Sequence, residues 1–428
     1  MVRIRELSAA AGQVVSVAGW LHHRREGGRV RFLEVRDGTG VVQCVARREA
    51  LAPEVWDVSG ELGLETSLRV VGPVRRDERA PGGVELVVQE LVPVHRTAGY
   101  PITPKEHGVD FLMDHRHLWI RSPRQAAILR VRAALMRAVR EFLDARGFVE
   151  VTAPVLTHTA CEGTSQLFET RYFDQPAFLS QSGQLYNEAA IAALGRVYCF
   201  GPAFRAERSK TRRHLQEFWM VEPEMAFAGF EENLEVQEAL VVHVVERVVA
   251  ACAEELARVG RDPEALARVT APFPRLSYDE ALRLLRAQGL ELAWGEDLGA
   301  PHETAIARAF DRPVFVHRYP ARAKPFYMQP DPDQPELVLN ADLLAPEGYG
   351  EIAGGSVRIE EVELLTRRMA EAGIDAAQLE WYVDLRRYGS VPHAGFGLGI
   401  ERTLAWILGL EHVRETTAFP RLLYRLYP

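Results

Sequence analysis

The sequence predicts a protein of two parts, a small N-terminal β-barrel followed by a larger α+β domain built on an antiparallel sheet. Three observations predict this multidomain architecture. The chain has 428 residues, which exceeds the usual size of a single hydrophobic core. Residues 14–98 are short valine-rich stretches separated by turn residues. Residues 123–428 instead mix strand-like and helix-like stretches without regular βαβ alternation.

The N-terminal part, residues 1–98, is expected to form five strands. They are 14–23, 30–37, 40–46, 68–76 and 84–94. Asp37-Gly38 and Gly82-Gly83 mark hairpin turns. Five strands in so short a segment indicate a barrel of the OB type, which is a common oligonucleotide-binding scaffold. A small barrel that binds no ligand remains the alternative.

An irregular hinge over residues 99–122 is expected to join the two parts. Ser122 and Pro123 then supply a helix N-cap and a first-turn proline. Apolar residues recur every three or four positions after them, which predicts an amphipathic helix over 124–146, closed by Gly147. The recurring residues are Ile128, Val131, Leu135, Val139 and Phe142.

The C-terminal part, residues 123–428, is expected to hold an antiparallel sheet. Its strand-like stretches are 148–151, 197–207, 214–227 and 337–344. They lie close together in sequence or flank long helical insertions, which favours an α+β domain over a doubly wound one. The sequence contains no GxxxxGK[ST] loop and no GxGxxG after a strand. Any nucleotide must therefore be held in another way.

Composition and charge exclude several classes of protein. The longest apolar stretches fall well short of the roughly 20 residues that span a bilayer, and the N-terminus shows no signal-peptide pattern. The four cysteines show no paired spacing, so a cytoplasmic protein is expected, without zinc knuckles or disulfides. The net charge of −8 argues against a protein that coats nucleic acid, although residues 24–36 hold five arginines and form a locally basic segment.

A segment around residue 205 carries the clearest chemical signal. Alternating residues on both sides of the basic stretch 208–213 predict two antiparallel strands joined by a loop. Arg205 lies between apolar Phe204 and Ala206, so it is expected to point into a pocket, where its guanidinium suits a phosphate oxygen. Phe218 on the returning strand is placed to stack on a purine. A charged hairpin exposed to solvent is the alternative.

Two further segments are weak alone. Residues 147–156 read as a strand that ends at Pro154, directly after the long helix. In residues 395–407 glycines alternate along a strand that gives way to a helix, which is typical of close approach by a ligand or another backbone. Arg402 falls in the first turn of that helix, from which it would reach over the ligand.

Together and in this order, the three segments resemble the signature motifs of the class II aminoacyl-tRNA synthetases over essentially the whole chain. The resemblance implies a six- or seven-stranded antiparallel sheet, amino-acid activation with ATP and Mg²⁺, transfer to tRNA, and a homodimer formed through the segment with Pro154. It further implies roles for single residues. Arg205 would bind the α-phosphate, Glu207 the adenosine or tRNA end, His214 the ATP tail, Phe218 the adenine and Arg402 the γ-phosphate, with Arg205, Glu207 and Arg402 catalytic.

The same resemblance implies a metal site and an anticodon site. Asp342 and Glu351 match the family's metal carboxylates, with Glu351 also at the ATP, and hard oxygen ligands suit Mg²⁺. Solvated carboxylates in a glycine-rich loop are the alternative. In the barrel, Arg25, Phe32 and Gln43 match the positions that contact the anticodon in the family. An aromatic ring and an amide are sufficient to recognise an unpaired base, which agrees with this match. Phe32 as plain barrel core is the alternative.

The amino-acid pocket decides between aspartate and asparagine within the family. Aspartyl enzymes usually carry Lys at the position of Asn187, which would neutralise the substrate carboxylate. Glu222 stands where those enzymes have Asp, and it would accept the amide of L-asparagine and repel aspartate. The resemblance therefore favours the asparaginyl branch. In it Arg358 would contact the side-chain oxygen, and Glu162, Ser182 and Gln184 would also bind the amino acid, Glu162 and Gln184 at the α-ammonium.

Three alternatives stay open at this point. Val357 and Gln166 depart from the asparaginyl pattern, so a non-discriminating aspartyl enzyme that charges both tRNA(Asp) and tRNA(Asn) with aspartate is the nearest one. A synthetase-like paralogue that makes free asparagine would lack the barrel, which is present here. A non-catalytic RNA-binding module would have no need for the charged residues of the three motifs.

Overall fold

The computed structural model describes residues 1–158 and 167–428, and it divides into two compact units, Met1–Met113 and Asp114–Pro428. Glu162 and Gln166, which the sequence places near the amino acid, lie outside the described residues. The cysteines in the described ranges, Cys44, Cys199 and Cys252, are buried and free. Within those ranges no helix is long and apolar enough to cross a membrane.

The N-terminal unit is a closed five-stranded barrel, which confirms the expected OB fold. The strands are β1 (Val14–Gly27), β2 (Val30–Arg36), β3 (Val41–Arg47), β4 (Ser67–Arg76), β5 (Val84–Val87) and β6 (Glu90–His95). The first five close the ring in the order β1-β2-β3-β5-β4, because β4 also pairs with β1, and β6 adds to β4. Helix α1 (Pro53–Glu61), between β3 and β4, was not predicted.

The strand expected over 84–94 is interrupted at Val88 and Gln89, which was not predicted. The amide of Val88 donates to the carbonyl of Val45, whereas that of Gln89 donates to the carbonyl of Val71. The break lies beside Gly72, where a Cβ would come within 1.7 Å of the carbonyl oxygen of Val87. The two halves, β5 and β6, therefore keep β4 as a common neighbour but only β5 also pairs with β3.

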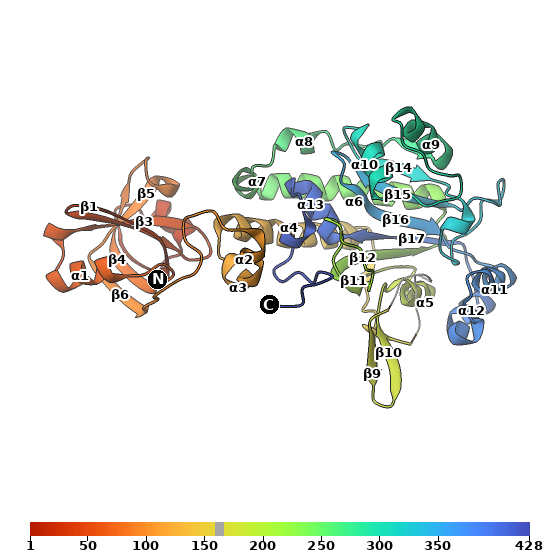
Figure 1. The fold of residues 1–428 in the computed structure, drawn as a ribbon, viewed down its shortest axis with the longest axis horizontal. Coiled ribbons are helices and arrows are strands. Elements are labelled where there is room, and N and C mark those ends of the chain that lie inside the picture. The colour runs from red at the N-terminus through yellow and green to blue at the C-terminus, as the bar shows by residue number, and fades with distance from the viewer. Residues whose placement is uncertain (159–166) are drawn as a thin grey trace. The chain divides into compact units, whose positions relative to one another are not determined.

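The C-terminal unit is built on an eight-stranded sheet, larger than the six or seven strands expected. Its order is β13-β14-β15-β16-β17-β12-β11-β7. Figure 1 labels the strands from β14 to β11, which lie side by side in this order. The strands are β7 (Val149–Glu150), β11 (Arg196–Phe204), β12 (Glu217–Ala226), β13 (Arg275–Ser277), β14 (Val314–His317), β15 (Asn340–Ala345), β16 (Gly350–Val357) and β17 (His393–Gly399). The central six are antiparallel as predicted, and the two outermost strands add in parallel.

Helices and a small second sheet complete this unit. Helix α2 (Val109–Asp114) ends at the division between the units. The helices of the C-terminal unit are α3 (Arg116–Trp119), α4 (Pro123–Ala145), α5 (Gln184–Leu194), α6 (Phe230–Ala251), α7 (Ala253–Val259), α8 (Pro263–Ala267), α9 (Tyr278–Ala287), α10 (Ala300–Arg308), α11 (Val362–Glu371), α12 (Glu380–Arg387) and α13 (Ile400–Leu408). The small sheet holds β8 (Leu156–Thr157), β9 (Glu169–Tyr172) and β10 (Gln175–Leu179), whose last two strands form a projecting hairpin (Figure 1).

Helix α4 confirms the helix predicted over 124–146. The hydroxyl of Ser122 accepts from the amide of Gln125 at 3.3 Å, so it caps the helix as expected. All five of the recurring apolar residues are buried: Ile128, Val131, Leu135, Val139 and Phe142. Helix α4 packs against α6, α7 and α13, and α6 and α13 in turn pack on the central strands.

The two faces of the central strands have opposite character, because side chains alternate along a strand. On β12, Val221 and Met225 lie in the main hydrophobic core, whereas Glu222 and Glu224 line a cavity on the other face. On β15, Leu343 belongs to the core and Asp342 to the cavity. The central strands thus carry α4, α6, α13 and the main core on one face, and a charged cavity bordered by α5 and α10 on the other.

Truncating the core at Leu135 is expected to destabilise the C-terminal unit by about 2–5 kcal/mol, because Leu135→Ala leaves a cavity beneath the sheet. Urea unfolding of the full chain, followed by circular dichroism, measures the change. Glu141→Ala on the same helix is the control, since Glu141 is exposed and its ion pair with Arg247 is worth at most about 1 kcal/mol. Equal losses from both variants would contradict the described core.

Candidate active site

Two adjoining cavities open on the face of the eight-stranded sheet that carries Glu222, Glu224 and Asp342. The larger has a volume of about 310 Å³. Both are lined by five common residues, Arg205, Glu207, Met220, Glu351 and Gly397. The cavities therefore form one continuous site, in which the smaller part holds the aromatic ring of Phe218 and the larger part holds most of the charged groups.

The predicted pair of strands around residue 205 is present and places Arg205 and Phe218 together. Strands β11 and β12 pair from Arg196 opposite Met225 to Phe204 opposite Glu217. The amide of Arg205 continues the ladder to the carbonyl of Gln216 at 3.1 Å. The guanidinium of Arg205 lies 5.5 Å from the centre of the Phe218 ring. An aromatic ring and a guanidinium thus share one pocket, and the exposed-hairpin alternative does not hold.

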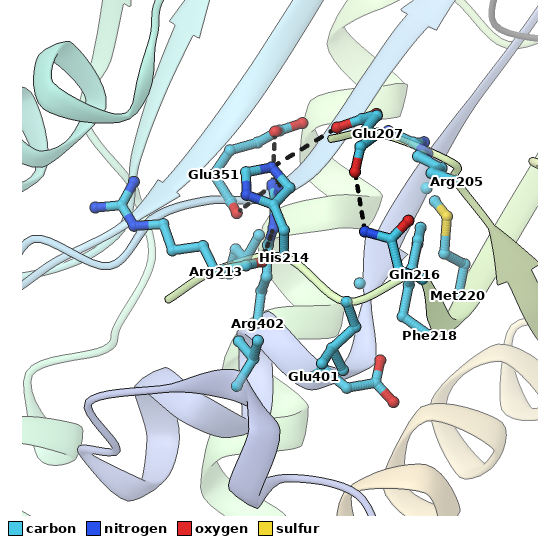
Figure 2. Close-up of a pocket in the computed structure, with 15 residues that line it drawn as sticks. Arg205, Glu207, Arg213, His214, Gln216, Phe218, Met220, Glu351, Glu401 and Arg402 are labelled. Carbon is cyan, nitrogen blue, oxygen red and sulfur yellow. Dashed lines mark hydrogen bonds and ion pairs between the residues drawn. The ribbon is translucent and has the colours of Figure 1, made fainter. Parts of the chain in front are cut away.

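Arg402 lies across the same pocket, in the first turn of α13, as the sequence suggested. Its Nη1 donates to Oε2 of Glu351 at 2.8 Å and to the Glu351 carbonyl at 3.2 Å. Its Nη2 lies 3.4 Å from Nε2 of His214, which is 4.0 Å from the carboxylate of Glu207. Burial and the nearby Arg402 hold the pKa of His214 below its usual value. Figure 2 shows Glu351, His214 and Arg402 grouped on one side of the pocket and Arg205 and Phe218 on the other.

Sequence reasoning missed two residues of this pocket wall, Arg213 and Glu303. Arg213 contacts the Glu303 carboxylate at 3.2 Å, the hydroxyl of Thr304 and the carbonyl of Gly348. Glu303 also accepts the amide of Glu351 at 2.9 Å. Arg213 was hidden in a run of basic residues, where the strand pattern gives no facing, and Glu303 lies on α10 within no recognisable motif.

The two predicted metal carboxylates face each other across the β15–β16 hairpin, so they do not belong to a solvated loop. A Cβ built on Gly354 would lie 3.3 Å from Oδ1 of Asp342 and 3.1 Å from Oε1 of Glu351, so these two oxygens converge on one small space. Across residues 1–158 and 167–428 no cluster of three or more His, Cys, Asp or Glu groups is arranged to hold a metal. Two convergent carboxylates fit Mg²⁺, which usually takes one or two and completes its shell with water and phosphate.

Each of these carboxylates has a cationic neighbour on its other oxygen. The ammonium of Lys324 lies 2.8 Å from Oδ2 of Asp342 and 3.1 Å from Asp297. Burial raises the pKa of Asp342 to about 7, an effect that Lys324 opposes. Burial would also raise the pKa of Glu351, but Arg402 and Lys324 outweigh it and hold that pKa below its usual value. Lys324, one of three lysines in the chain, was not assigned a role from sequence.

One end of the larger cavity contains a buried ion pair between Arg358 and Glu224. Arg358 donates from Nη2 and Nε to the two oxygens of Glu224, at 2.5 and 3.3 Å, and from Nη1 to the Ser356 hydroxyl at 2.8 Å. Burial raises the pKa of Glu224 to about 7 against the opposing effect of Arg358. Glu224 was missed from sequence, yet Gly395 marks it: a Cβ there would lie 2.2 Å from the Glu224 carboxyl group.

Glu222 and Ser182 line the cavity as predicted, but Asn187 does not. The carboxylate of Glu222 accepts from the amide of Gly183 at 2.8 Å and from the hydroxyl of Ser182, at the start of α5. Asn187 is fully buried and lies against β12, the strand of Glu222. Its side-chain amide donates to the carbonyl of Glu222 at 2.7 Å and to Cys199 Sγ at 3.2 Å. Residue 187 therefore acts on the site through the backbone of Glu222 rather than by facing the substrate, which corrects the sequence argument.

The barrel brings its three predicted anticodon residues together. Arg25 lies opposite Phe32 across β1 and β2, with its guanidinium 5.5 Å from the ring centre. It also donates to Oε1 of Gln43 at 3.0 Å, and Gln43 donates to Glu85 at 3.3 Å. Phe32 is half-buried and stands outside the hydrophobic core of the barrel, so the plain-core alternative does not describe it.

Comparisons with known proteins agree with both units. Residues 108–423 match the family model of the class II tRNA synthetases (D, K and N), and residues 15–94 match the OB-fold nucleic acid binding domain. An asparagine–tRNA ligase of Pelotomaculum thermopropionicum is 56% identical over 427 residues, which cover 100% of this chain and 99% of that protein.

Solved structures show the same likeness. The crystal structure of asparaginyl-tRNA synthetase from Pyrococcus horikoshii complexed with asparaginyl-adenylate has a TM-score of 0.97 at 45% identity, covering 100% of this chain and 99% of that one. An aspartyl-tRNA synthetase from Entamoeba histolytica has a TM-score of 0.85 at 28% identity, covering 100% and 92%. By the family match and the identity to full-length relatives, the chain belongs to the class II tRNA synthetases of the D, K and N group, within the asparagine–tRNA ligase family.

Proposed function

We propose that this protein activates L-asparagine with ATP, forming asparaginyl-adenylate and pyrophosphate, and then transfers the asparaginyl group to the 3′ end of tRNA(Asn). The Arg358–Glu224 pair in the larger cavity is the observation that carries this proposal. A carboxamide presents an oxygen acceptor beside an N–H₂ donor, and the pair presents a guanidinium donor beside a carboxylate acceptor. The printed names of the full-length relatives support the same substrate.

Aspartate fits this end of the cavity poorly. Its second carboxylate would lie beside Glu222 and Glu224, while the guanidinium of Arg358 is already shared with Glu224. A desolvated like-charge contact of this kind costs several kcal/mol. The asparaginyl reaction is therefore favoured over the non-discriminating aspartyl one.

Activation requires positioning and charge neutralisation rather than a protein nucleophile. The substrate carboxylate attacks the α-phosphorus of ATP, and pyrophosphate leaves. Arg205 would bind the α-phosphate, His214 the ATP tail, Arg402 the γ-phosphate and Phe218 the adenine, and all four line the smaller cavity. Glu207, on the border of the two cavities, is placed for the adenosine or the tRNA end. Mg²⁺, held by Asp342 and Glu351, would supply further positive charge to the phosphates.

Three further proposals concern partners and surroundings. The anticodon of the tRNA would contact Arg25, Phe32 and Gln43 in the barrel. A homodimer would form through the segment of Pro154, where Val149, Val155 and Leu156 each leave 41–43% of their surface exposed. A cytoplasmic location would supply the ATP and tRNA that the reaction requires.

The purified protein is expected to catalyse asparagine-dependent ATP–pyrophosphate exchange with Mg²⁺ present. The exchange rate with aspartate is expected to be lower by a factor of at least about 100. The cause is the repulsion described for Glu222 and Glu224. Comparable exchange with aspartate would instead assign the protein to the non-discriminating aspartyl class. Absence of exchange with both amino acids would contradict the proposed activation of an amino acid with ATP.

Replacing the stacking ring in the barrel is expected to affect tRNA charging alone. Phe32→Ala should raise the KM for tRNA(Asn) about tenfold, because stacking of a base on an aromatic ring is worth about 1–3 kcal/mol. ATP–pyrophosphate exchange should not change, since it needs no tRNA. Arg25→Ala should act in the same direction. Arg79→Ala is its control, because Arg79 is fully exposed in the same barrel and pairs only with Asp77. Equal effects of all three variants would contradict the assigned surface.

Removing one carboxylate of the proposed metal site is expected to weaken Mg²⁺ binding. Asp342→Asn should raise the Mg²⁺ concentration at half-maximal exchange by at least about tenfold, since even outer-shell partners of a metal are worth 10–100-fold. Asp297→Asn is the matched control, because Asp297 shares Lys324 but its side chain is half exposed. An unchanged Mg²⁺ dependence in Asp342→Asn would place the metal elsewhere.

A further inference from the structure

We propose that Glu188 is a positioning residue for the amino-acid substrate: it orients the Gln184 amide so that its carbonyl oxygen faces the cavity and accepts the α-ammonium group. This inference rests on the proposed function and adds to it a residue that does not line either part of the site.

The geometry of α5 sets the orientation of Gln184. Gln184 is the first residue of the helix and lines the larger cavity, and Glu188 lies one turn further on, 3% exposed. Nε2 of Gln184 donates to Oε1 of Glu188 at 3.0 Å. An ionised carboxylate can only accept, so it selects the N–H₂ side of the amide. The carbonyl oxygen of Gln184 is then left for the cavity, where a positively charged ligand group requires an acceptor.

Glu188 is itself held from three directions. Its Oε2 accepts from the hydroxyl of Tyr382 at 2.7 Å, from Nη2 of Arg386 at 2.6 Å and from Nε2 of His393 at 3.0 Å. These donors come from α12 and from the first residue of β17. The carboxylate is deeply buried, and its cationic neighbours, Arg386 first, hold its pKa well below the usual range. It therefore stays ionised and cannot rotate away from Gln184.

The same donors also fix the opposite end of the substrate site. Nε of Arg386 donates to the carbonyl of Ile359 at 2.8 Å, and the amide of Arg358 donates to the carbonyl of His393 at 2.9 Å. The backbone that carries Arg358 is thus attached to the two residues that hold Glu188. One buried cluster sets both Gln184, at the ammonium end, and Arg358, at the carboxamide end.

Two ligands that differ only in the α-ammonium test the proposal. Succinamic acid has the carboxylate and carboxamide of L-asparagine but no amino group, and its inhibition constant against exchange measures binding without that group. In Glu188→Gln the side chain at 188 can donate as well as accept, so the Gln184 amide loses its fixed orientation. We expect the KM for asparagine to rise about tenfold, with the succinamate inhibition constant and the KM for ATP unchanged.

Further variants separate positioning from folding. Tyr382→Phe removes a donor to Oε2 but leaves the Gln184 contact, so it should preserve the ratio of asparagine to succinamate binding. If Glu188→Gln alone does not fold, Glu188→Gln with Arg386→Met removes both buried charges. That variant should weaken the binding of asparagine more than that of succinamate, which the lost contact of Arg386 with Ile359 also affects. Gln184→Met should reproduce the selective loss of asparagine binding, and adding Glu188→Gln to it should change nothing further.

The outcomes are distinguishable. Equal weakening of asparagine and succinamate by Glu188→Gln, or weakening of neither, would overturn the positioning role while leaving the proposed function intact. Additive losses from Gln184→Met and Glu188→Gln would overturn it as well. Absence of asparagine-dependent exchange in the unaltered protein would overturn the proposed function and the positioning role with it.

Discussion

The site depends on one electrostatic constraint, that a carboxylate buried in or beneath the sheet face needs a cation or hydrogen-bond donors beside it. Glu224 has Arg358, Glu188 has Arg386, Asp342 has Lys324 and Glu351 has Arg402. In the two pairs that are almost fully buried, Glu224–Arg358 and Glu188–Arg386, loss of one member costs about 3–5 kcal/mol, because the other charge remains without compensation. The pairs join segments far apart in sequence, so the charges that prepare the cavity for its substrates also hold its walls in place.

This arrangement explains how a sheet without a phosphate-binding loop can receive a nucleotide. The strands supply alternation, which sends apolar side chains to the helices and charged ones to the cavity. Arg402 on α13 then contacts Glu351 on β16, and Arg213 in the 208–213 loop contacts the carbonyl of Gly348 in the β15–β16 turn. These contacts bring two cations to the cavity. The groups that would meet phosphate are thus pre-organised by contacts with the protein's own carboxylates.

Local patterns allowed the sequence to predict most of the frame and part of the site. The cap at Ser122 and the spacing from Ile128 to Phe142 predicted α4, because both signals lie within a single element. Arg205 and Phe218 were found together because a hairpin connects them. Glu224, Glu303 and Lys324 were missed, since their places depend on distant strands and helices. The facing of Asn187 was inferred from a family position, and only the packing under Glu222 shows it turned away.

Gly395 makes the position of the Glu224 carboxylate sensitive to any substitution at residue 395. Its backbone passes so close to Glu224 that a single added methyl group would occupy the space of the carboxyl carbon, 2.2 Å away. The proposed recognition of the amide by this pair therefore depends on the absence of a side chain at residue 395. A substitution at residue 395 would displace Glu224 without touching the substrate. Such positions limit how the amino-acid specificity of this fold can change in evolution.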